Sequence, residues 1–288
     1  MAAYLTSSSK VIAIGATGAY GRAQIAFMVR SGTPVLANVS VGRGGDEIDG
    51  VPVFDTVADA VAATGADTAI IYTPALGLKS SIVECADAGI QLAVAAAEHV
   101  PLQDAVYALA YARERGLWVS GPNTVGMLTP GQAILGAISP EFGLPGRVAI
   151  VGRSGTLTLT VTRMLTRTGI GQSAIVHVGG DMVCGRNPHE WVQAFVADPR
   201  TSAVVYLGEI GGLKEYAMAD VISASAKPVV ALVVGRNAPE GKRMGHAGAI
   251  VGGDRERAQA KLDALKEAGA QVATSPAKIV RLLEVMQG

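Results

Sequence analysis

Short apolar runs alternate with stretches of helical composition along almost the whole chain, and glycines mark most of the junctions. The chain has 288 residues, of which 36 are glycine, and the usual share of glycine is about 7%. Because these glycines fall between periodic segments and form no low-complexity tract, we interpret them as the tight turns of a repeated strand–helix architecture. Strands that alternate with helices of about ten residues favour parallel βαβ units.

The first 122 residues are predicted to form a doubly wound, Rossmann-like α/β domain. The expected strands are 10–14, 34–41, 68–72, 92–96 and 117–119, and the expected helices are 19–30, 56–64, 78–88 and 102–115. Prolines and glycines then break the alternation between Gly121 and Gly146. We therefore expect residues 123–146 to be a linker or inter-domain segment.

The alternation restarts at Arg147, so residues 147–288 are predicted to form a second α/β domain with a doubly wound, flavodoxin-like parallel sheet. The expected strands are 147–151, 173–178, 203–207, 228–234 and 271–273, and the expected helices are 156–168, 188–197, 214–225, 254–268 and 275–286.

The composition argues against several classes of protein. With 24 basic and 24 acidic residues and 5% aromatics, the chain gives no support for a nucleic-acid surface. No apolar run approaches the roughly 18 residues of a membrane helix, and the first ten residues show no secretory signal. Cys85 and Cys184 form no metal-ligand spacing. We expect a cytoplasmic protein without a metal site, membrane segment or nucleic-acid partner.

A glycine loop, Gly15-x-x-Gly18-x-x-Gly21, follows the first expected strand. Its spacing differs from the dinucleotide fingerprint, but amides at a helix N-terminus can hold phosphate in the same way. Arg43 stands in a glycine turn after the second strand, where an NAD site would have an acid. An arginine there suits NADP or coenzyme A, and the alternative is a solvated turn arginine. Glu98, which ends the fourth strand, is a further candidate ligand position.

The stretch Gly241-Lys-Arg-Met-Gly-His-Ala-Gly-Ala-Ile250 places His246 among small residues, following the strand that ends near Val234. An imidazole with little to pack against locally is poorly placed as core filler and well placed as a nucleophile. The alternative is an ordinary surface loop. His177, inside an apolar strand, is predicted to be a core histidine, and His189 to lie at a helix start without a special role.

Two further features suit a histidine that becomes phosphorylated. Ser154 is predicted to cap a helix whose free amides at Gly155 and Thr156 would attract an anion, although a plain capping role explains Ser154 equally well. Glu209, at a strand end, is expected to accept the N–H of one imidazole nitrogen and so make the other nitrogen more nucleophilic.

These stretches resemble the α subunit of succinyl-CoA synthetase (succinate–CoA ligase) over essentially the full chain. The matching segments are Gly121-Pro-Asn123, Arg153-Ser-Gly-Thr-Leu-Thr158, Gly179-Gly-Asp181, Gly208-Glu-Ile-Gly-Gly212 and Gly241–Ile250. The resemblance implies a coenzyme A-binding first domain. The residues that it assigns to coenzyme A are Thr17, Gly18, Ala19, Tyr20, Arg43, Ala96, Ala97 and Glu98.

In the second domain the resemblance makes His246 the transiently phosphorylated residue and Glu209 the residue that positions it. A nucleoside triphosphate and a small carboxylic acid would give an acyl phosphate by way of this histidine, and coenzyme A would then form the thioester, a reaction of the tricarboxylic acid cycle. The chain has no Walker-type nucleotide motif. An ATP-grasp β subunit carrying ATP or GTP with Mg is therefore implied, in an αβ or α2β2 assembly.

The chain departs from the family where the acid would bind. The family commonly has Gly-Pro-Asn-Cys-Pro-Gly, whereas Thr124 and Val125 follow Asn123 here. Leu159 replaces a tyrosine to which the family assigns substrate contact, and leucine cannot donate a hydrogen bond to a carboxylate. Asn123, Thr124 and Leu159 are the candidate substrate residues, and an acid other than succinate is a serious alternative.

Two rival functions remain open. An NADP-dependent reductase would share the glycine loop and Arg43, but it leaves the His246 loop, Glu209 and Ser154 unexplained. A non-catalytic, regulatory coenzyme A-binding subunit would keep the fold without turnover. The altered substrate positions favour that alternative, whereas the intact His246 and Glu209 argue against it.

Overall fold

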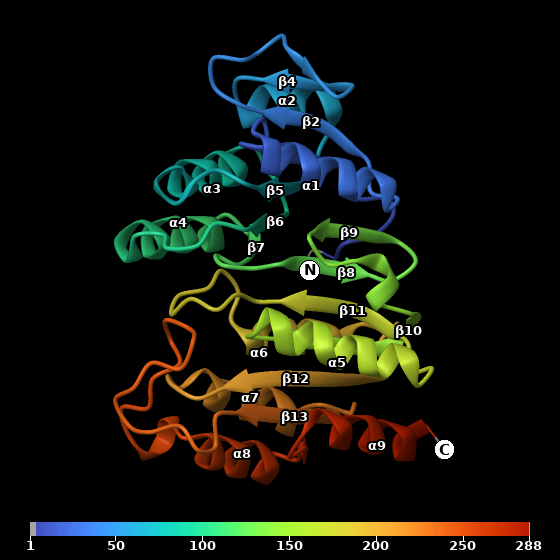
Figure 1. The fold of residues 1–288 in the computed structure, drawn as a ribbon, viewed down its shortest axis with the longest axis vertical. Helices are drawn as coiled ribbons and strands as arrows, with labels where there is room; N and C mark the ends of the chain where they lie inside the picture. The colour runs from blue at the N-terminus through green and yellow to red at the C-terminus, as the bar shows by residue number, and fades with distance from the viewer. Residues whose placement is uncertain (1–3, 288) are drawn as a thin grey trace. The chain divides into compact units, whose positions relative to one another are not determined.

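The computed structural model describes residues 4–287, and the chain divides into two compact units (Figure 1). One unit consists of the residues up to 140 together with 183–185, and the other of residues 141–182 and those from 186 onward. Each unit is built on strands that are mostly parallel. The predicted α/β fold class is therefore confirmed.

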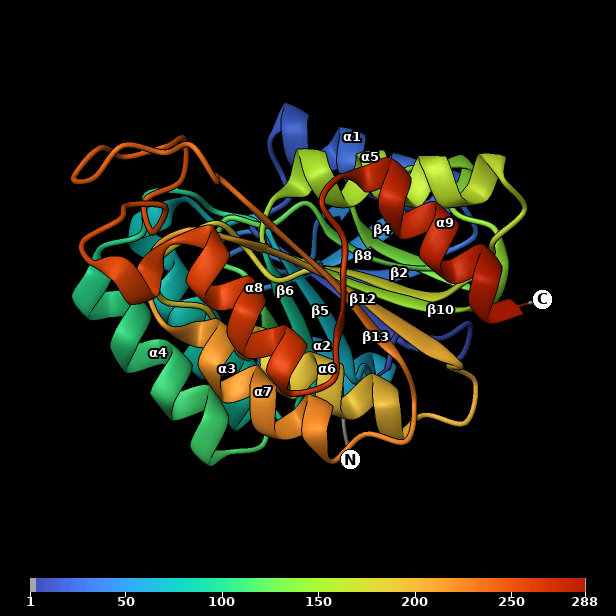
Figure 2. The same cartoon turned by 90° about the horizontal axis from the view of Figure 1, so that it is seen from below.

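The first unit contains a sheet with strand order β3-β4-β2-β1-β5-β6-β7. Its elements are β1 (Val11–Ile14), α1 (Ala19–Arg30), β2 (Val35–Val39), β3 (Glu47–Ile48), β4 (Val51–Phe54), α2 (Val57–Thr64), β5 (Thr68–Ile71), a 3₁₀ turn (Ala75–Gly77), α3 (Leu78–Asp87), β6 (Leu92–Ala95), α4 (Leu102–Glu114) and β7 (Trp118–Ser120). Helix α1 lies on one face of the sheet and α2, α3 and α4 on the other (Figure 2). Since both faces are covered, β1, β5 and β6 are buried throughout.

The connections in this sheet reverse direction at β1, which pairs in parallel with β2 on one side and β5 on the other. Ligands of open α/β sheets collect outside the carboxyl ends of the strands at such a point. The loop that begins at Gly15 follows β1 directly, so it stands where a ligand is expected. Helix α1 has the bounds predicted from the sequence.

Residues 123–146, expected to be a linker, contain strands β8 (Gly126–Thr129) and β9 (Ala133–Gly136). These strands pair in antiparallel fashion with Met127 opposite Leu135, and both are buried. Gly126 has a φ of +103°, and a Cβ there would collide with the carbonyl of Leu135. The turn at Pro130 and Gly131 joins the two strands. Proline and glycine in this stretch thus mark a hairpin.

The second unit has parallel strands in the order β14-β13-β12-β10-β11. Its elements are a 3₁₀ turn (Pro140–Phe142), β10 (Pro145–Gly152), α5 (Gly155–Arg167), β11 (Gln172–His177), α6 (Pro188–Ala197), β12 (Ala203–Glu209), α7 (Lys214–Ser223), β13 (Val229–Val234), a 3₁₀ turn (Asp254–Glu256), α8 (Ala258–Glu267), β14 (Gln271–Val272) and α9 (Pro276–Gln287). Helices α5 and α9 cover one face of these strands, and α6, α7 and α8 cover the other (Figure 2). No helix within residues 4–287 is long and apolar enough to span a membrane.

Candidate active site

The carboxyl ends of three neighbouring strands in the second unit supply the candidate site. β12 pairs in parallel with β10 on one side and with β13 on the other. These strands end at Gly152, Glu209 and Val234. Because parallel strands end at the same edge of a sheet, the residues that follow them converge there.

His246 and Glu209 are in direct contact, although 37 positions separate them in the sequence. The imidazole Nδ1 lies 2.5 Å from a carboxylate oxygen, Oε2, of Glu209. Since an ionised carboxylate can only accept, Nδ1–H is the donor, and in a neutral imidazole Nε2 then carries the free lone pair. The side chain of His246 is 28% exposed and that of Glu209 only 8%. The carboxylate is therefore fixed inside the unit while the imidazole borders solvent.

Arg153 holds the other oxygen of the same carboxylate. Its Nη2 and Nε lie 3.0 and 3.2 Å from Oε1 of Glu209, and both side chains are buried. Burial pushes the pKa of Glu209 upward, but the hydrogen bond from His246 and the charge of Arg153 outweigh it and leave the pKa below the usual value. Glu209 thus stays ionised and faces His246 and Arg153 with different oxygens.

The hydrogen bond to Glu209 raises the pKa of His246, while burial opposes that shift and the Glu209 charge adds to it. Arg153 lowers this pKa and Asp181 raises it by smaller amounts. Gly180 lies beside the ring, since a Cβ at this position would be 3.2 Å from Cδ2 of His246. Gly245 has a φ of +88°, so glycine shapes the backbone just ahead of the histidine.

Helix α5 begins immediately after Arg153. Ser154 is its N-cap, and the hydroxyl accepts a hydrogen bond from the amide of Leu157 at 3.4 Å. Thr156 is exposed, and the first turn contains no acidic residue. The remaining free amides at Gly155 and Thr156 give this end of the helix a partial positive charge. The predicted cap is present, and the anion site at Gly155 and Thr156 stays a prediction.

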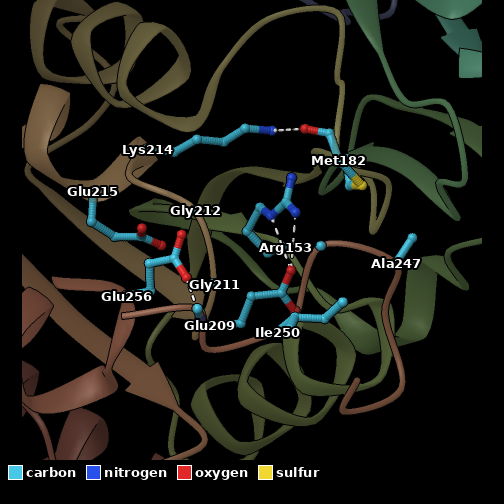
Figure 3. A pocket seen from close by; sticks show the side chains of 12 residues that line it. Arg153, Met182, Glu209, Gly211, Gly212, Lys214, Glu215, Ala247, Ile250 and Glu256 are labelled. Carbon is cyan, nitrogen blue, oxygen red and sulfur yellow. Dashed lines mark hydrogen bonds and ion pairs between the residues drawn. The ribbon is translucent and has the colours of Figure 1, made fainter. Parts of the chain in front are cut away.

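A cavity of about 370 Å³ opens behind the His246 loop. Its walls come from the turn after β12, the first turn of α7 and residues 247–252 of the loop. Figure 3 shows Arg153 reaching the Glu209 carboxylate, and Lys214 reaching the carbonyl of Met182. Arg153, Glu209 and Ala247, which follows His246, all line this cavity.

Leu159 lies one turn further along α5, in a surface groove that also includes Phe142, Thr156, Thr160 and Arg163. Arg163 stacks over the ring of Phe142, with its Cζ 4.8 Å from the ring centroid. Leu159 thus belongs to the same helix as the anion-binding amides, three residues beyond Thr156.

The glycine loop of the first unit has a backbone that needs glycine at two positions, Gly15 and Gly21. Gly15 has a φ of +73°, and a Cβ on Gly21 would come within 2.5 Å of the Cα of Ala16. In contrast, nothing lies within 4 Å of the position of a Cβ on Gly18. Gly18 is the N-cap of α1 and provides no side-chain cap. Helix α1 therefore begins at a glycine with open space beside it, and the N-terminus of a helix can hold a phosphate.

The other predicted coenzyme A residues of the first unit lie in the first turn of α1 or after the ends of β2 and β6. Tyr20 is exposed and stacks edge-on against Tyr72. Arg43 is exposed, and its Nε lies 2.9 Å from Asp46. Ala96, Ala97 and Glu98 directly follow β6, with Glu98 exposed. The structure brings these positions to the carboxyl edge of one sheet, where a ligand is expected.

The two substrate candidates of the first unit, Asn123 and Thr124, are adjacent in the chain. Asn123 has a φ of +58°, next to a cis peptide bond between Gly121 and Pro122. Thr124 is buried, and its hydroxyl accepts from the amide of Gly126 at 3.0 Å. Thr124 therefore has a structural partner within its own segment.

Sequence reasoning assigned no role to three residues that shape the site: Arg153, Asp181 and Lys261. Arg153 begins the segment Arg153–Thr158 that resembles the family, between the end of a strand and the Ser154 cap. Lys261 is fully buried and donates to the carbonyl of Glu209 at 2.8 Å. In the sequence, Lys261 falls on the apolar stripe of the predicted helix 254–268, and a lysine at such a position indicates a buried, paired ammonium group.

The histidines predicted to play no catalytic part lie where they were expected. His177 is 4% exposed at the end of β11, and its Nε2 contacts the carbonyl of Arg153 at 3.1 Å. Burial lowers its pKa to about 4. His189 lies in the first turn of α6.

Two family models match the chain, one in each of its two compact units apart from residues 183–185. The model of the CoA binding domain matches residues 6–99, and that of CoA-ligase matches residues 151–272. "Succinate–CoA ligase [ADP-forming] subunit alpha 1" of Archaeoglobus fulgidus is 42% identical over 281 residues, covering 98% of this chain and 97% of the relative. The corresponding subunit alpha of Aquifex aeolicus is 41% identical and covers 100% and 96%.

Among solved structures, ATP citrate lyase from Methanothrix soehngenii, in complex with citrate and coenzyme A, superimposes with a TM-score of 0.88 at 26% identity. The match covers 99% of this chain but only 51% of the lyase chain. The dinucleotide-forming acetyl-coenzyme A synthetase 1 of Ca. Korarchaeum cryptofilum shares the fold, with a TM-score of 0.72 and 24% identity. With full-length relatives above 40% identity, the chain belongs to the family of succinate–CoA ligase α subunits and is a CoA ligase subunit.

Proposed function

We propose that this chain works as the phosphohistidine subunit of a two-subunit acyl-CoA synthetase. The observation that carries the proposal is the contact between His246 Nδ1 and Glu209 at 2.5 Å, in a glycine loop at the carboxyl edge of the sheet. Glu209 fixes the tautomer, so Nε2 is left as the nucleophile. A surface loop without function would have no reason to face a buried, ionised carboxylate.

The first step is attack by Nε2 of His246 on the γ-phosphorus of a nucleoside triphosphate. The N–P bond forms as the bond between the γ-phosphorus and the bridging oxygen breaks, and nucleoside diphosphate leaves. The imidazole becomes positively charged during attack, and the adjacent Glu209 carboxylate stabilises that charge. The raised pKa of His246 has the same origin.

The second step moves the phosphoryl group from Nε2 to the carboxylate of the acid, which gives an acyl phosphate. The amides at Gly155 and Thr156 are suited to hold the phosphate, because the N-terminus of a helix favours an anion. Bound coenzyme A supplies the thiol that converts the acyl phosphate to a thioester and releases inorganic phosphate. Residues 17–20, Arg43 and 96–98 are our candidates for binding it.

The nucleotide, with Mg, is assigned to a partner chain, and we propose an ATP-grasp β subunit in an αβ or α2β2 assembly. The sequence of this chain has no Walker-type phosphate loop. Its relatives are named as subunit alpha of an ADP-forming ligase. ATP is therefore the first nucleotide to test, and GTP the alternative.

The acid is small, and succinate is the first candidate because the relatives are succinate–CoA ligase subunits. A second candidate class is an acid other than succinate. It is favoured by the apolar Leu159 in the groove on α5 and by the internal hydrogen bond of Thr124. A panel of mono- and dicarboxylic acids, assayed by thioester formation, distinguishes the two.

The decisive experiment uses the chain co-purified with its β subunit and γ-labelled ATP. We expect a label on this chain that is lost at low pH and stable in base, and no label on a His246→Ala variant. Addition of the carboxylic acid substrate and coenzyme A should release the label. Absence of label from the wild-type complex, or equal label on the variant, would overturn the proposal. In that case coenzyme A binding without turnover would identify a regulatory subunit, and reduction of a substrate by NADPH would identify a reductase.

A further inference from the structure

A lysine without any exposed surface lies beneath the proposed site. Lys261 is 0% exposed, on the face of α8 that also buries Ala258, Leu262 and Leu265. Ammonium groups are rarely fully buried unless they are paired, because the loss of hydration is costly. The contacts of this group therefore decide what the lysine does.

The ammonium group makes two hydrogen bonds to backbone carbonyls and one ion pair. It donates to the carbonyl of Glu209 at 2.8 Å and to that of Gly211 at 2.7 Å. Its third partner is Oε2 of Glu215, at 2.6 Å. Two of the three contacts thus hold the backbone on either side of Ile210, where the chain leaves β12.

Glu215 compensates the lysine charge and leaves the Glu209 side chain free for other partners. Glu215 is 3% exposed, and its Oε1 accepts from the hydroxyl of buried Tyr206 at 2.7 Å. The buried charges therefore form two pairs, Lys261 with Glu215 and Arg153 with Glu209. Because the lysine contacts only the carbonyl of Glu209, the carboxylate still faces His246.

The turn at Glu209–Gly211 also contacts the loop that contains His246. Gly211 has a φ of +84°, and a Cβ there would collide with the carbonyl of Gly248 and the backbone of Ile250. The loop that contains His246 therefore packs directly on the backbone of Gly211, whose carbonyl Lys261 holds. One ammonium group is in this way connected to both members of the His246–Glu209 pair.

We propose that Lys261 is a positioning residue for phosphoryl transfer, which fixes the turn at Glu209–Gly211 so that the Glu209 carboxylate stays against Nδ1 of His246. This inference rests on the proposed phosphohistidine. Lys261 itself touches neither nucleotide nor acid. Its effect should appear in the rate and pH dependence of His246 phosphorylation, and not in the affinity for coenzyme A.

The test uses the complex with the β subunit and three variants: Lys261→Met, the double variant Lys261→Met with Glu215→Gln, and Lys266→Met. Lys266 is an exposed lysine on the same helix and serves as the matched control. The double variant removes both buried charges, so it avoids an unpaired carboxylate that would destabilise the fold. The rate of label transfer from ATP is measured against pH, together with the melting temperature and the affinity for coenzyme A.

We expect the double variant to melt below the wild-type temperature, because the carbonyls of Glu209 and Gly211 lose their hydrogen bonds, but to stay folded and bind coenzyme A normally. Its phosphorylation should be about 10- to 100-fold slower, the range typical of residues that orient a metal-bound histidine. The charges that face His246 are those of Glu209, Arg153 and Asp181, and Glu209 raises the pKa of the imidazole most. In the double variant Glu209 would contact the ring less closely, so the midpoint of the pH profile should move to lower pH. Lys266→Met should match the wild type.

Wild-type rate and pH profile in the double variant would overturn the inference. So would a double variant that loses coenzyme A binding together with the rate, since that result indicates a purely structural lysine. Failure of the phosphohistidine proposal gives a different result, because the wild-type complex then carries no label at all.

Discussion

Two histidines lie at the carboxyl edge of the second unit, and their surroundings are opposite. His177, at the end of β11, is 4% exposed and contacts the backbone carbonyl of Arg153. His246, after β13, borders solvent and contacts the ionised side chain of Glu209. Burial lowers the pKa of His177 to about 4, whereas the bond to Glu209 raises the pKa of His246. One imidazole is thereby kept neutral and enclosed, and the other is accessible and stabilised as a cation.

The difference shows that two histidines at the same edge of a parallel sheet can have opposite pKa shifts, according to burial and to the charge of their partners. His177 ends β11 and His246 follows β13, and β10 and β12 lie between these two strands of the sheet. His246 contacts the Glu209 carboxylate and has small neighbours on each side. Reactivity is expected where a partner stabilises the charge that develops on the ring.

Replacing the carboxylate should bring His246 closer to the state of His177. We expect Glu209→Ala to slow phosphorylation of this chain by about 100-fold, since the ring loses its orienting partner and charge stabilisation. The readout is single-turnover label transfer in the complex with the β subunit. A Glu209→Ala variant that is labelled at the wild-type rate would contradict the contrast.

The pH dependence has a defined sign. Nε2 attacks only when the imidazole is neutral, so the rate should rise with pH through the pKa of His246. In Glu209→Gln the negative charge that raises this pKa is gone. The midpoint should therefore move to lower pH while the plateau rate falls. A midpoint that moves upward, or stays in place, would rule out Glu209 as the cause of the shift.

His177 should instead limit stability in acid. Its pKa is about 4 in the fold and about 6.5 when unfolded, so the unfolded chain binds more protons between these values. Stability should fall as pH is lowered through that window, by about 3 kcal/mol in total from this group. His177→Gln keeps a donor for the Arg153 carbonyl without titrating. Urea unfolding at pH 7 and 5 should show a smaller difference for His177→Gln than for wild type, whereas equal differences would contradict the assignment.

Gly180→Ala probes the space beside the reactive ring. A Cβ there would be 3.2 to 3.4 Å from three atoms of the His246 ring, which is tighter than ordinary packing and requires the ring to move by a few tenths of an ångström. We expect phosphorylation to slow several-fold without change in the melting temperature. A matched Gly253→Ala variant, whose added methyl has open space, should leave the rate unchanged.

The smallest effect is expected for Asp181→Asn. Asp181 raises the pKa of His246 by the smallest of the named contributions, so its removal should shift the pH midpoint downward by less than Glu209→Gln does. A larger shift than in Glu209→Gln would mean that Asp181 is the principal partner.

Much of the fold was predictable from local pattern. The helix at Ala19–Arg30 and the helix at Pro188–Ala197 have the predicted bounds, because glycine, proline and capping residues mark their ends. The β8–β9 hairpin was not predicted. Its strands have four residues each and stand among prolines and glycines that also typify linkers, so local pattern could not distinguish the two.

The site was predictable only in part. His246 and Glu209 were candidates because of their glycine-rich settings and the family resemblance, and their contact depends on the adjacency of β12 and β13, which sequence spacing does not specify. Arg153 and Lys261 were missed as partners because each reaches Glu209 from a different strand or helix, over 56 and 52 positions. The contacts of these two residues with Glu209 depend on the strand order and on the packing of α8, which local sequence pattern does not specify.

In the proposed mechanism, Nε2 of His246 carries the phosphoryl group while Nδ1 stays in contact with Glu209. Phosphorylation of the complex with ATP, without a carboxylic acid or coenzyme A, followed by ³¹P and ¹⁵N NMR of the labelled chain, locates the phosphate. The structure predicts a single phosphohistidine substituted at Nε2 of His246. Phosphate at Nδ1, or on another residue such as Ser154, would contradict it.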